Sequence, residues 1–280
     1  MKKPFLIIIF LVSNLVSIAQ TLNLTPYLVN PIGGKEFTSN LASANVALNI
    51  REQIIYQEIV KGNIPDYLMK LSKISHTEII DGKAYTIAFY VTPDYLSIGN
   101  DSDNVYIPMT PILAQKVATK FNCSLPTKKM VDLIYNSATI KLEPKPIPPS
   151  DLMTTIFVLK QHDEMVKEQL KPFLDDHQKS ELTAGNKKDV IISNKIYTEA
   201  TPKVVIYGWH KLDGKPIQPV YNKHANTWAD YSHGIRLLQN NVWVNGKKTT
   251  IAKVLADQKL AVLLSDEGVI KKAYYPITDY

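Results

Sequence analysis

The chain has 280 residues and a single cysteine, Cys123. One cysteine excludes a disulfide within the chain and any framework of cross-links. Stability must therefore come from a buried apolar core, which a chain of roughly 260 residues can build without disulfide cross-links. Hydrophobic residues make up 45% and charged residues 21%, a balance that indicates a globular protein and not a disordered one.

Long apolar runs are also missing, except at the N-terminus. A basic dipeptide (2–3) precedes a short apolar run (5–18), and small residues follow at Ser17 and Ala19. This pattern predicts a cleaved signal peptide over residues 1–19, the alternative being an uncleaved anchor. No later segment is long and apolar enough to span a bilayer. We therefore expect an exported protein, periplasmic or secreted, without a lipid-modified cysteine behind the signal.

A strong excess of one charge sign is absent as well. The formal charge is +6, and removing residues 1–19, with two lysines and no acids, leaves +4. The basic residues are spread along the chain with acids between them. A nucleic-acid footprint needs clustered basic residues with interleaved aromatics, so we expect no nucleic-acid partner.

The first half of the chain predicts helices and one β-hairpin. Apolar spacing favours a helix from Ser43 to about Lys61, and a hairpin of strands 71–80 and 84–91. Thr110-Pro111 marks a helix start, and a second helix begins near Ser124 or Thr127.

The second half predicts one long helix and then mainly antiparallel strands. Four prolines between 144 and 149 form a stiff connector and a possible subdomain break within a single domain of residues 20–280. A helix is expected from Ser150 to Leu170, and a hairpin at Asn245-Gly246. Because helices and strands do not alternate regularly, the fold class is predicted as α+β.

Candidate chemistry gathers between Trp209 and Trp243, a segment with all three tryptophans and three of the six histidines. Imidazoles can move protons near neutral pH, a guanidinium can hold an anion, and aromatic rings stack on sugars or peptides. We expect catalytic roles for His233, His210 and Asp230. The expected substrate-binding residues are Arg236, Trp209, Trp228 and Tyr231.

Two chemistries remain open for this segment. His224, Asp230 and His233, with His210 as a possible fourth ligand, would suit zinc with one position left for an activated water. Alternatively, Cys123 would act as a thiol nucleophile activated by His233 or His210, its pKa lowered by a following helix. The metal site is the favoured hypothesis.

A short segment resembles the catalytic loop of the L,D-transpeptidases, which cross-link peptidoglycan. It reads Ser232-His233-Gly234-Ile235-Arg236-Leu237, with Asn240 following. The family's loop has a cysteine after the glycine, and here none lies between Gly234 and Ile235. The resemblance implies that Ser232, His233, Gly234 and Arg236 belong to a site for peptide stems, and it supplies no nucleophile.

A weaker pattern lies at residues 100–104, where Asn, Asp and Ser side chains are crowded together. The segment lacks the glycine and the distant glutamate of an EF-hand loop, so it predicts a polar turn and not a calcium site.

These observations together predict an exported hydrolase of the cell envelope. It would act on a peptide- or glycan-containing extracytoplasmic polymer, or on a small-molecule substrate, through a site centred on His233 and Asp230. The alternative is a non-catalytic exported protein that binds glycans or peptides through its aromatic residues.

Overall fold

The computed structural model describes residues 20–22 and 31–280, so the predicted signal peptide lies outside the described residues. Both helices and antiparallel strands are present, and the predicted α+β class is confirmed. The α-helices are α1 (Gly34–Ala44), α2 (Leu48–Val60), α3 (Pro111–Lys120), α4 (Lys128–Ser137), α5 (Ile156–Leu170) and α6 (Ile251–Ala256). Short 3-10 helices are η1 (Asp66–Met69), η2 (Lys171–Asp175), η3 (Asn194–Tyr197) and η4 (Ala261–Leu263).

The strands form two main sheets and two short pairs. Their bounds are β1 (Ser72–Ile80), β2 (Lys83–Val91), β3 (Ser97–Gly99), β4 (Asn104–Tyr106), β5 (Cys123–Ser124), β6 (Ile140–Lys141), β7 (Thr183–Ala184), β8 (Lys188–Val190), β9 (Ile206–His210), β10 (Pro216–Tyr221), β11 (His233–Gly234), β12 (Leu238–Gln239), β13 (Asn241–Val244) and β14 (Lys247–Thr250). β3 pairs with β4, and β6 pairs with β7.

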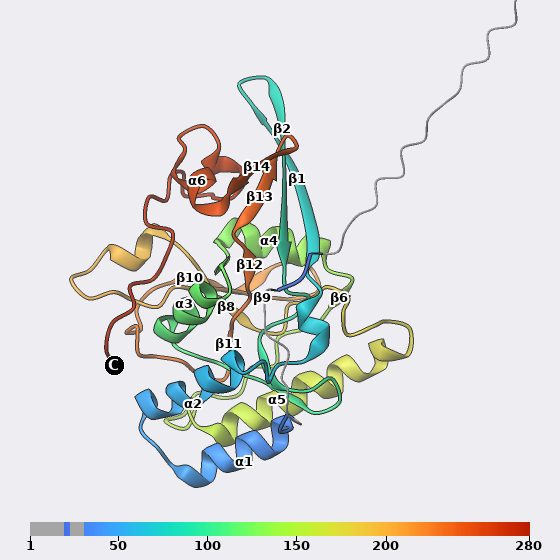
Figure 1. Ribbon diagram of the computed structural model, residues 1–280, viewed down its shortest axis with the longest axis vertical. Coiled ribbons are helices and arrows are strands. Elements are labelled where there is room, and N and C mark those ends of the chain that lie inside the picture. Colours follow the sequence, from blue (N-terminus) through green and yellow to red (C-terminus); the bar gives the residue numbers. More distant parts are fainter. Residues whose placement is uncertain (1–19, 23–30) are drawn as a thin grey trace, which may run out of the picture.

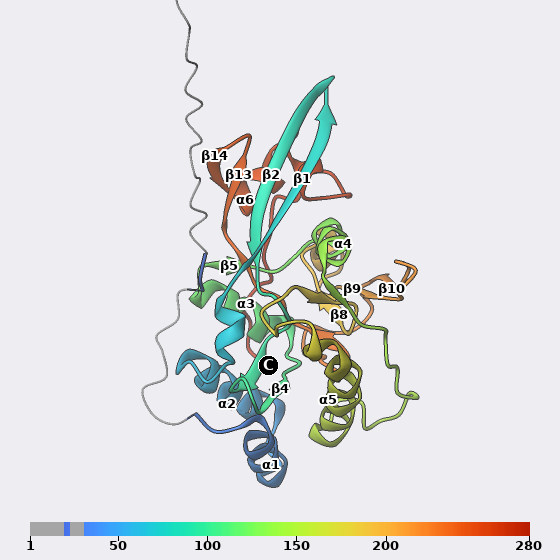
Figure 2. The ribbon, with the colours of Figure 1, turned by 90° about the vertical axis from the view of Figure 1, so that its right-hand side faces the viewer.

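The first sheet has the order β14-β13-β2-β12-β5, with β1 paired to β2, and its pairings are antiparallel. The predicted β1–β2 hairpin runs without a register shift from Ser72↔Val91 to Ile80↔Lys83. It projects from the rest of the molecule in both views (Figures 1 and 2). Its base is anchored because Ile87 and Phe89 are fully buried.

The second sheet has the order β10-β9-β8-β11 and carries the candidate site. β9 is antiparallel to both neighbours, whereas β11 is parallel to β8, with His233 opposite Lys188. Residues 235–237 have no regular secondary structure, but Ile235 and Leu237 accept backbone hydrogen bonds from Leu96 and Thr92. Residues 233–237 are therefore held between the two sheets.

Helices α1, α2 and α5 lie close together at the end opposite the hairpin, whereas α4 and α6 lie beside the first sheet (Figure 1). Two helix starts are as predicted, because Thr110 and Thr127 cap α3 and α4. The expected helix from Ser43 to Lys61 is wrong in detail: Asn45 adopts a left-handed φ of 42° and separates α1 from α2. No helix of the described residues has the length and apolarity needed to cross a membrane.

The start of the long helix also differs from the prediction. Ser150 does not cap it; residues 151–155 form turns, and Thr155 accepts a hydrogen bond from the Val158 N–H at the true start of α5. The proline-rich connector before it has no regular secondary structure, and its Ile147 hydrogen-bonds with the Tyr231 hydroxyl at 2.7 and 3.1 Å. The subdomain break stays a prediction.

Candidate functional site

Buried polar atoms without a hydrogen-bond partner are concentrated in one region. The described residues contain nine such side-chain atoms, and seven of them belong to His162, Asn186, Asp189, His233 and Arg236. Native proteins satisfy nearly all buried polar groups, so a cluster of exceptions needs an explanation. Buried, perturbed ionisable groups of this kind are a common property of functional sites.

The parallel pairing of β11 with β8 brings these residues together. His233 and Gly234 lie opposite Lys188 and Asp189. A Cβ at Gly234 would lie 2.6 Å from a ring carbon of Tyr95, so only glycine allows this approach. The position after His233 is therefore fixed by packing.

Asp230 and His233 form the central pair of the site. Their nearest atoms, Oδ2 and Nε2, are 3.9 Å apart, and both side chains are buried. Asp230 Oδ1 accepts from the backbone N–H of Ser232 at 2.8 Å and from its hydroxyl at 2.5 Å. Trp228 Nε1 donates weakly to Oδ2 at 3.4 Å. The carboxylate is thus oriented, whereas neither ring nitrogen of His233 has a partner.

The pKa values of both members of this pair are lowered, but for different reasons. Burial lowers the pKa of His233 to about 4, more than the Asp230 carboxylate can compensate. Burial alone would raise the pKa of Asp230, but His233, Lys188 and the Ser232 donors outweigh it and bring the pKa to about 2. At neutral pH the pair is therefore an unprotonated imidazole beside a carboxylate. A general base must start unprotonated, and it is strongest in this role when its pKa lies near the working pH.

A buried lysine adjoins the pair, and sequence analysis did not identify it. Lys187 is 1% exposed, and its Nζ donates to the Tyr231 carbonyl at 2.8 Å and lies 3.0 Å from His162 Nδ1. Burial lowers the pKa of Lys187 to about 8 and that of His162 to about 2, so His162 is neutral and accepts from the ammonium. Lys187-Lys188-Asp189 reads as a solvated strand entry, yet two of the three side chains are buried.

Arg236 and Asp189 form the inner wall of the region. Arg236 is fully buried and donates to the carbonyls of Thr92 and Thr183 at 2.9 and 2.7 Å. Its Nε is 3.9 Å from Asp189 Oδ1, and Tyr95 donates to Asp189 Oδ2 at 2.7 Å. Burial raises the pKa of Asp189 to about 6. In this conformation Arg236 is used by the fold and does not face an open substrate site.

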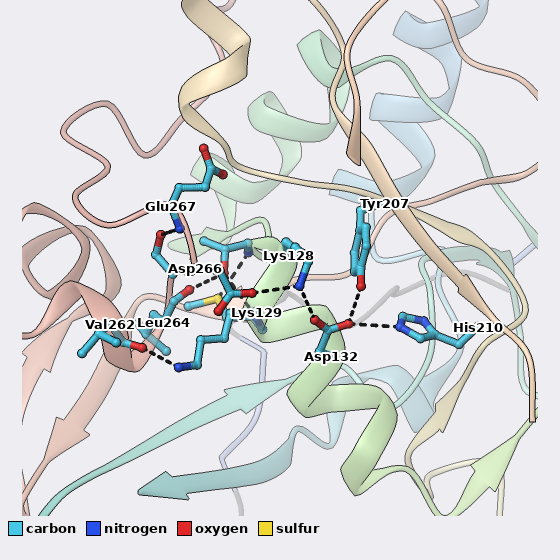
Figure 3. Close-up of polar contacts among 12 residues, drawn as sticks. Lys128, Lys129, Asp132, Tyr207, His210, Val262, Leu264, Asp266 and Glu267 are labelled. Atoms are coloured by element: carbon cyan, nitrogen blue, oxygen red, sulfur yellow. Dashed lines mark hydrogen bonds and ion pairs between the residues drawn. The ribbon is translucent and has the colours of Figure 1, made fainter. Parts of the chain in front are cut away.

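His210 belongs to a different network, on β9 and α4 (Figure 3). Its Nε2 is 3.1 Å from Asp132 Oδ1, which also accepts from the Tyr207 hydroxyl at 2.7 Å. Lys128 donates to the other Asp132 oxygen at 2.8 Å, and the His210 ring stacks on Tyr135. These contacts connect α4 to β9, and they do not place His210 beside His233.

The predicted aromatic residues divide into an inner and an outer group. Trp209 and Tyr231 are buried, with ring centroids 6.4 Å apart, and Trp209 has a left-handed φ of 58°. Such a conformation is strained for a bulky residue, and strained residues cluster at functional sites. His224 and Trp228 stack at 4.9 Å and are only partly buried. Lys188 places its ammonium 4.9 Å from the Trp209 ring and is also partly exposed.

Among the described residues, neither the zinc site nor the thiolate–imidazole pair expected from the sequence has the geometry it needs. Within residues 20–22 and 31–280, no three His, Cys, Asp or Glu side chains are arranged to hold a metal ion, so His224, Asp230 and His233 are not gathered as zinc ligands. Cys123 is buried in β5, its thiol donates to the Phe121 carbonyl at 3.5 Å, and burial raises its pKa to about 12. A thiolate–imidazole pair is therefore contradicted.

A cavity of about 10 Å³ lies beside Asp230 and Tyr231, under Met153 and Leu159. This volume is about that needed for one water molecule. Comparison with protein-family models, with curated proteins and with solved structures gave no match.

Proposed function

We propose that this chain is an exported hydrolase that cleaves a peptide- or glycan-containing polymer outside the cytoplasm, with His233 as general base. One observation carries the proposal: a fully buried, unprotonated imidazole with two unpartnered nitrogens lies 3.9 Å from an oriented carboxylate. Export is supported by the predicted signal peptide. The resemblance of residues 232–237 to the L,D-transpeptidase loop supports the peptide part of peptidoglycan as the substrate.

The chemistry follows from the charge states of the pair. His233 would take a proton from water as the oxygen attacks the scissile carbon, and would return that proton to the leaving group. Asp230 would stabilise the imidazolium formed in between. Lys188, partly exposed above the Trp209 ring, would hold negative charge on the substrate. His224 and Trp228 provide the accessible stacking surface.

The test is the release of soluble fragments from purified peptidoglycan, compared with a panel of insoluble and soluble glycans. His233→Ala should reduce turnover roughly 10²- to 10⁴-fold, as expected for loss of a general base. Asp230→Asn should also lower turnover, because the imidazolium loses its counter-charge. His76→Ala is the matched control, since His76 lies on β1 and pairs with Glu78 at 2.8 Å. Full activity of His233→Ala on a substrate that the native chain cleaves would refute the assignment.

A second candidate is a binding protein without catalysis, and the stacked His224–Trp228 pair favours it. These rings are partly exposed, whereas Asp230 and His233 are buried. On this alternative, Trp228→Ala would abolish co-sedimentation with the polymer, His233→Ala would leave it unchanged, and no fragments would be released.

A further inference from the structure

A cavity of about 400 Å³ opens between α5, the first turn of α1 and the loop that joins β3 to β4. In Figure 1 these helices lie beside each other at the end away from the hairpin. The volume is in the range that holds small ligands in proteins. Neither Asp230 nor His233 lines this cavity, so it is separate from the proposed catalytic pair.

One wall is a rigid polar turn, as the sequence predicts for residues 100–104. Asn100 Oδ1 accepts from the backbone N–H groups of Ser102 and Asp103 at 3.0 and 2.9 Å. The Asp103 carboxylate in turn accepts from the Lys35 N–H in the first turn of α1 at 3.2 Å. The oxygens of this turn are therefore used within the fold and are not assembled for a cation.

The opposite wall is fixed to the first by Lys167 of α5. Its ammonium pairs with Asp163 at 2.7 Å and also donates to the Asn104 carbonyl. Asp163 accepts from the Tyr106 N–H at 2.9 Å, which ties the helix to β4. Both walls are held by the protein's own contacts, so the cavity is preformed.

The remaining charges around the cavity are unpaired and of both signs. Lys179 donates to the Asp101 carbonyl, and four other charged side chains remain: Glu164 and Glu168 on α5, Lys171 at the start of η2 and Lys35 on α1. None of these four forms an ion pair in the described part of the chain. All four are exposed to solvent. The apolar lining consists of Tyr67, Tyr106, Leu170 and Leu174.

We propose that this cavity binds a short peptide or amino acid that carries both a free amino group and a free carboxylate. Glu164 and Glu168 would hold the ammonium, Lys35 and Lys171 would hold the carboxylate, and an aliphatic side chain would lie on the apolar lining. A purely anionic ligand would meet the two glutamates, and a purely cationic ligand would meet the lysines. Only a ligand with both charges matches the whole arrangement.

The test is calorimetric titration of the mature chain with the tripeptide Ala-Leu-Ala, its N-acetylated form and its C-amidated form. Each cap removes one charge-assisted hydrogen bond, and should weaken binding roughly tenfold or more. Glu168→Gln should weaken binding of the free tripeptide but leave binding of the acetylated form unchanged, because that form has no ammonium to lose. Lys171→Gln should behave in the same way toward the amidated form. Lys120→Gln, exposed on α3 and away from the cavity, is the matched control.

Equal affinity for free and capped peptides would overturn the proposal, and so would equal losses for all three peptides in Glu168→Gln, or the absence of saturable binding. His233→Ala should bind the tripeptide normally. If the chain binds the peptide but hydrolyses no polymer, only the proposed function fails. If it hydrolyses polymer but does not distinguish the capped peptides, only the cavity proposal fails.

Discussion

At the residue scale, the fold keeps His233 unprotonated, and this makes the free energy of unfolding depend on pH. Burial places its pKa at about 4, against an ordinary value of 6.5. Between these values the unfolded chain binds a proton that the folded chain does not, so stability rises with pH across this window and is lost as the pH falls from about 6.5 to about 4. A shift of this size corresponds to roughly 3 kcal/mol.

We therefore expect the free energy of unfolding to depend less on pH in His233→Gln than in the native chain. Urea denaturation between pH 4 and 7 measures it, and the difference between the two proteins is the relevant quantity. Asp189 acts in the opposite direction, because its raised pKa of about 6 means stability lost as the pH rises, but it is present in both proteins. Identical pH profiles would show that His233 is not held neutral by the fold.

Residue identity alone revealed only part of this site. His233, Asp230 and the aromatic residues stand out because their types suit catalysis, and the side chains of His233 and Asp230 lie 3.9 Å apart. His210 has the same chemistry but faces Asp132, because β9 presents it to α4. Lys187 was missed because a lysine beside a second lysine reads as surface, and only the β8–β11 pairing shows that it is buried.

At the element scale, the sequence predicted correctly the hairpins and helix starts that depend only on residues near each other in the chain. The β1–β2 and β13–β14 hairpins and the caps at Thr110 and Thr127 follow from turn and capping chemistry. The parallel pairing of β11 with β8 could not be predicted, since it joins segments more than 40 residues apart through tertiary packing. The prediction of where α5 begins was wrong because two residues, Ser150 and Thr155, can both cap a helix.

The structure makes this choice testable. Thr155 accepts the Val158 N–H at the first turn of α5, so Thr155→Ala should lower the free energy of unfolding by about 1 kcal/mol. Ser150→Ala should change it by only a few tenths, because the Ser150 hydroxyl accepts only from the Leu152 N–H within an exposed turn. Urea denaturation of the two variants measures the difference. A larger loss in Ser150→Ala would mean that the helix begins earlier, as the sequence alone suggests.

At the scale of the whole molecule, Cys123 reports on the integrity of the core. It lies in β5 at the edge of the first sheet, opposite Gln239 of β12, and is 4% exposed. Burial raises its pKa to about 12, so almost no thiolate is present at neutral pH. Reaction with a disulfide reagent requires both exposure and the thiolate, and both require the surrounding sheet to open.

We therefore expect Ellman's reagent to label the native chain very slowly at pH 8 and to label one thiol per chain rapidly in concentrated urea. The native labelling rate should rise in parallel with any loss of global stability, for instance in Thr155→Ala, because α5 lies apart from β5 (Figure 2) and the substitution should expose Cys123 only by making unfolding of the whole chain easier. Fast stoichiometric labelling of the folded chain would show that the thiol is accessible and ionised. In that case the thiol-nucleophile hypothesis would return, and the buried position of Cys123 would have to be one of two conformations.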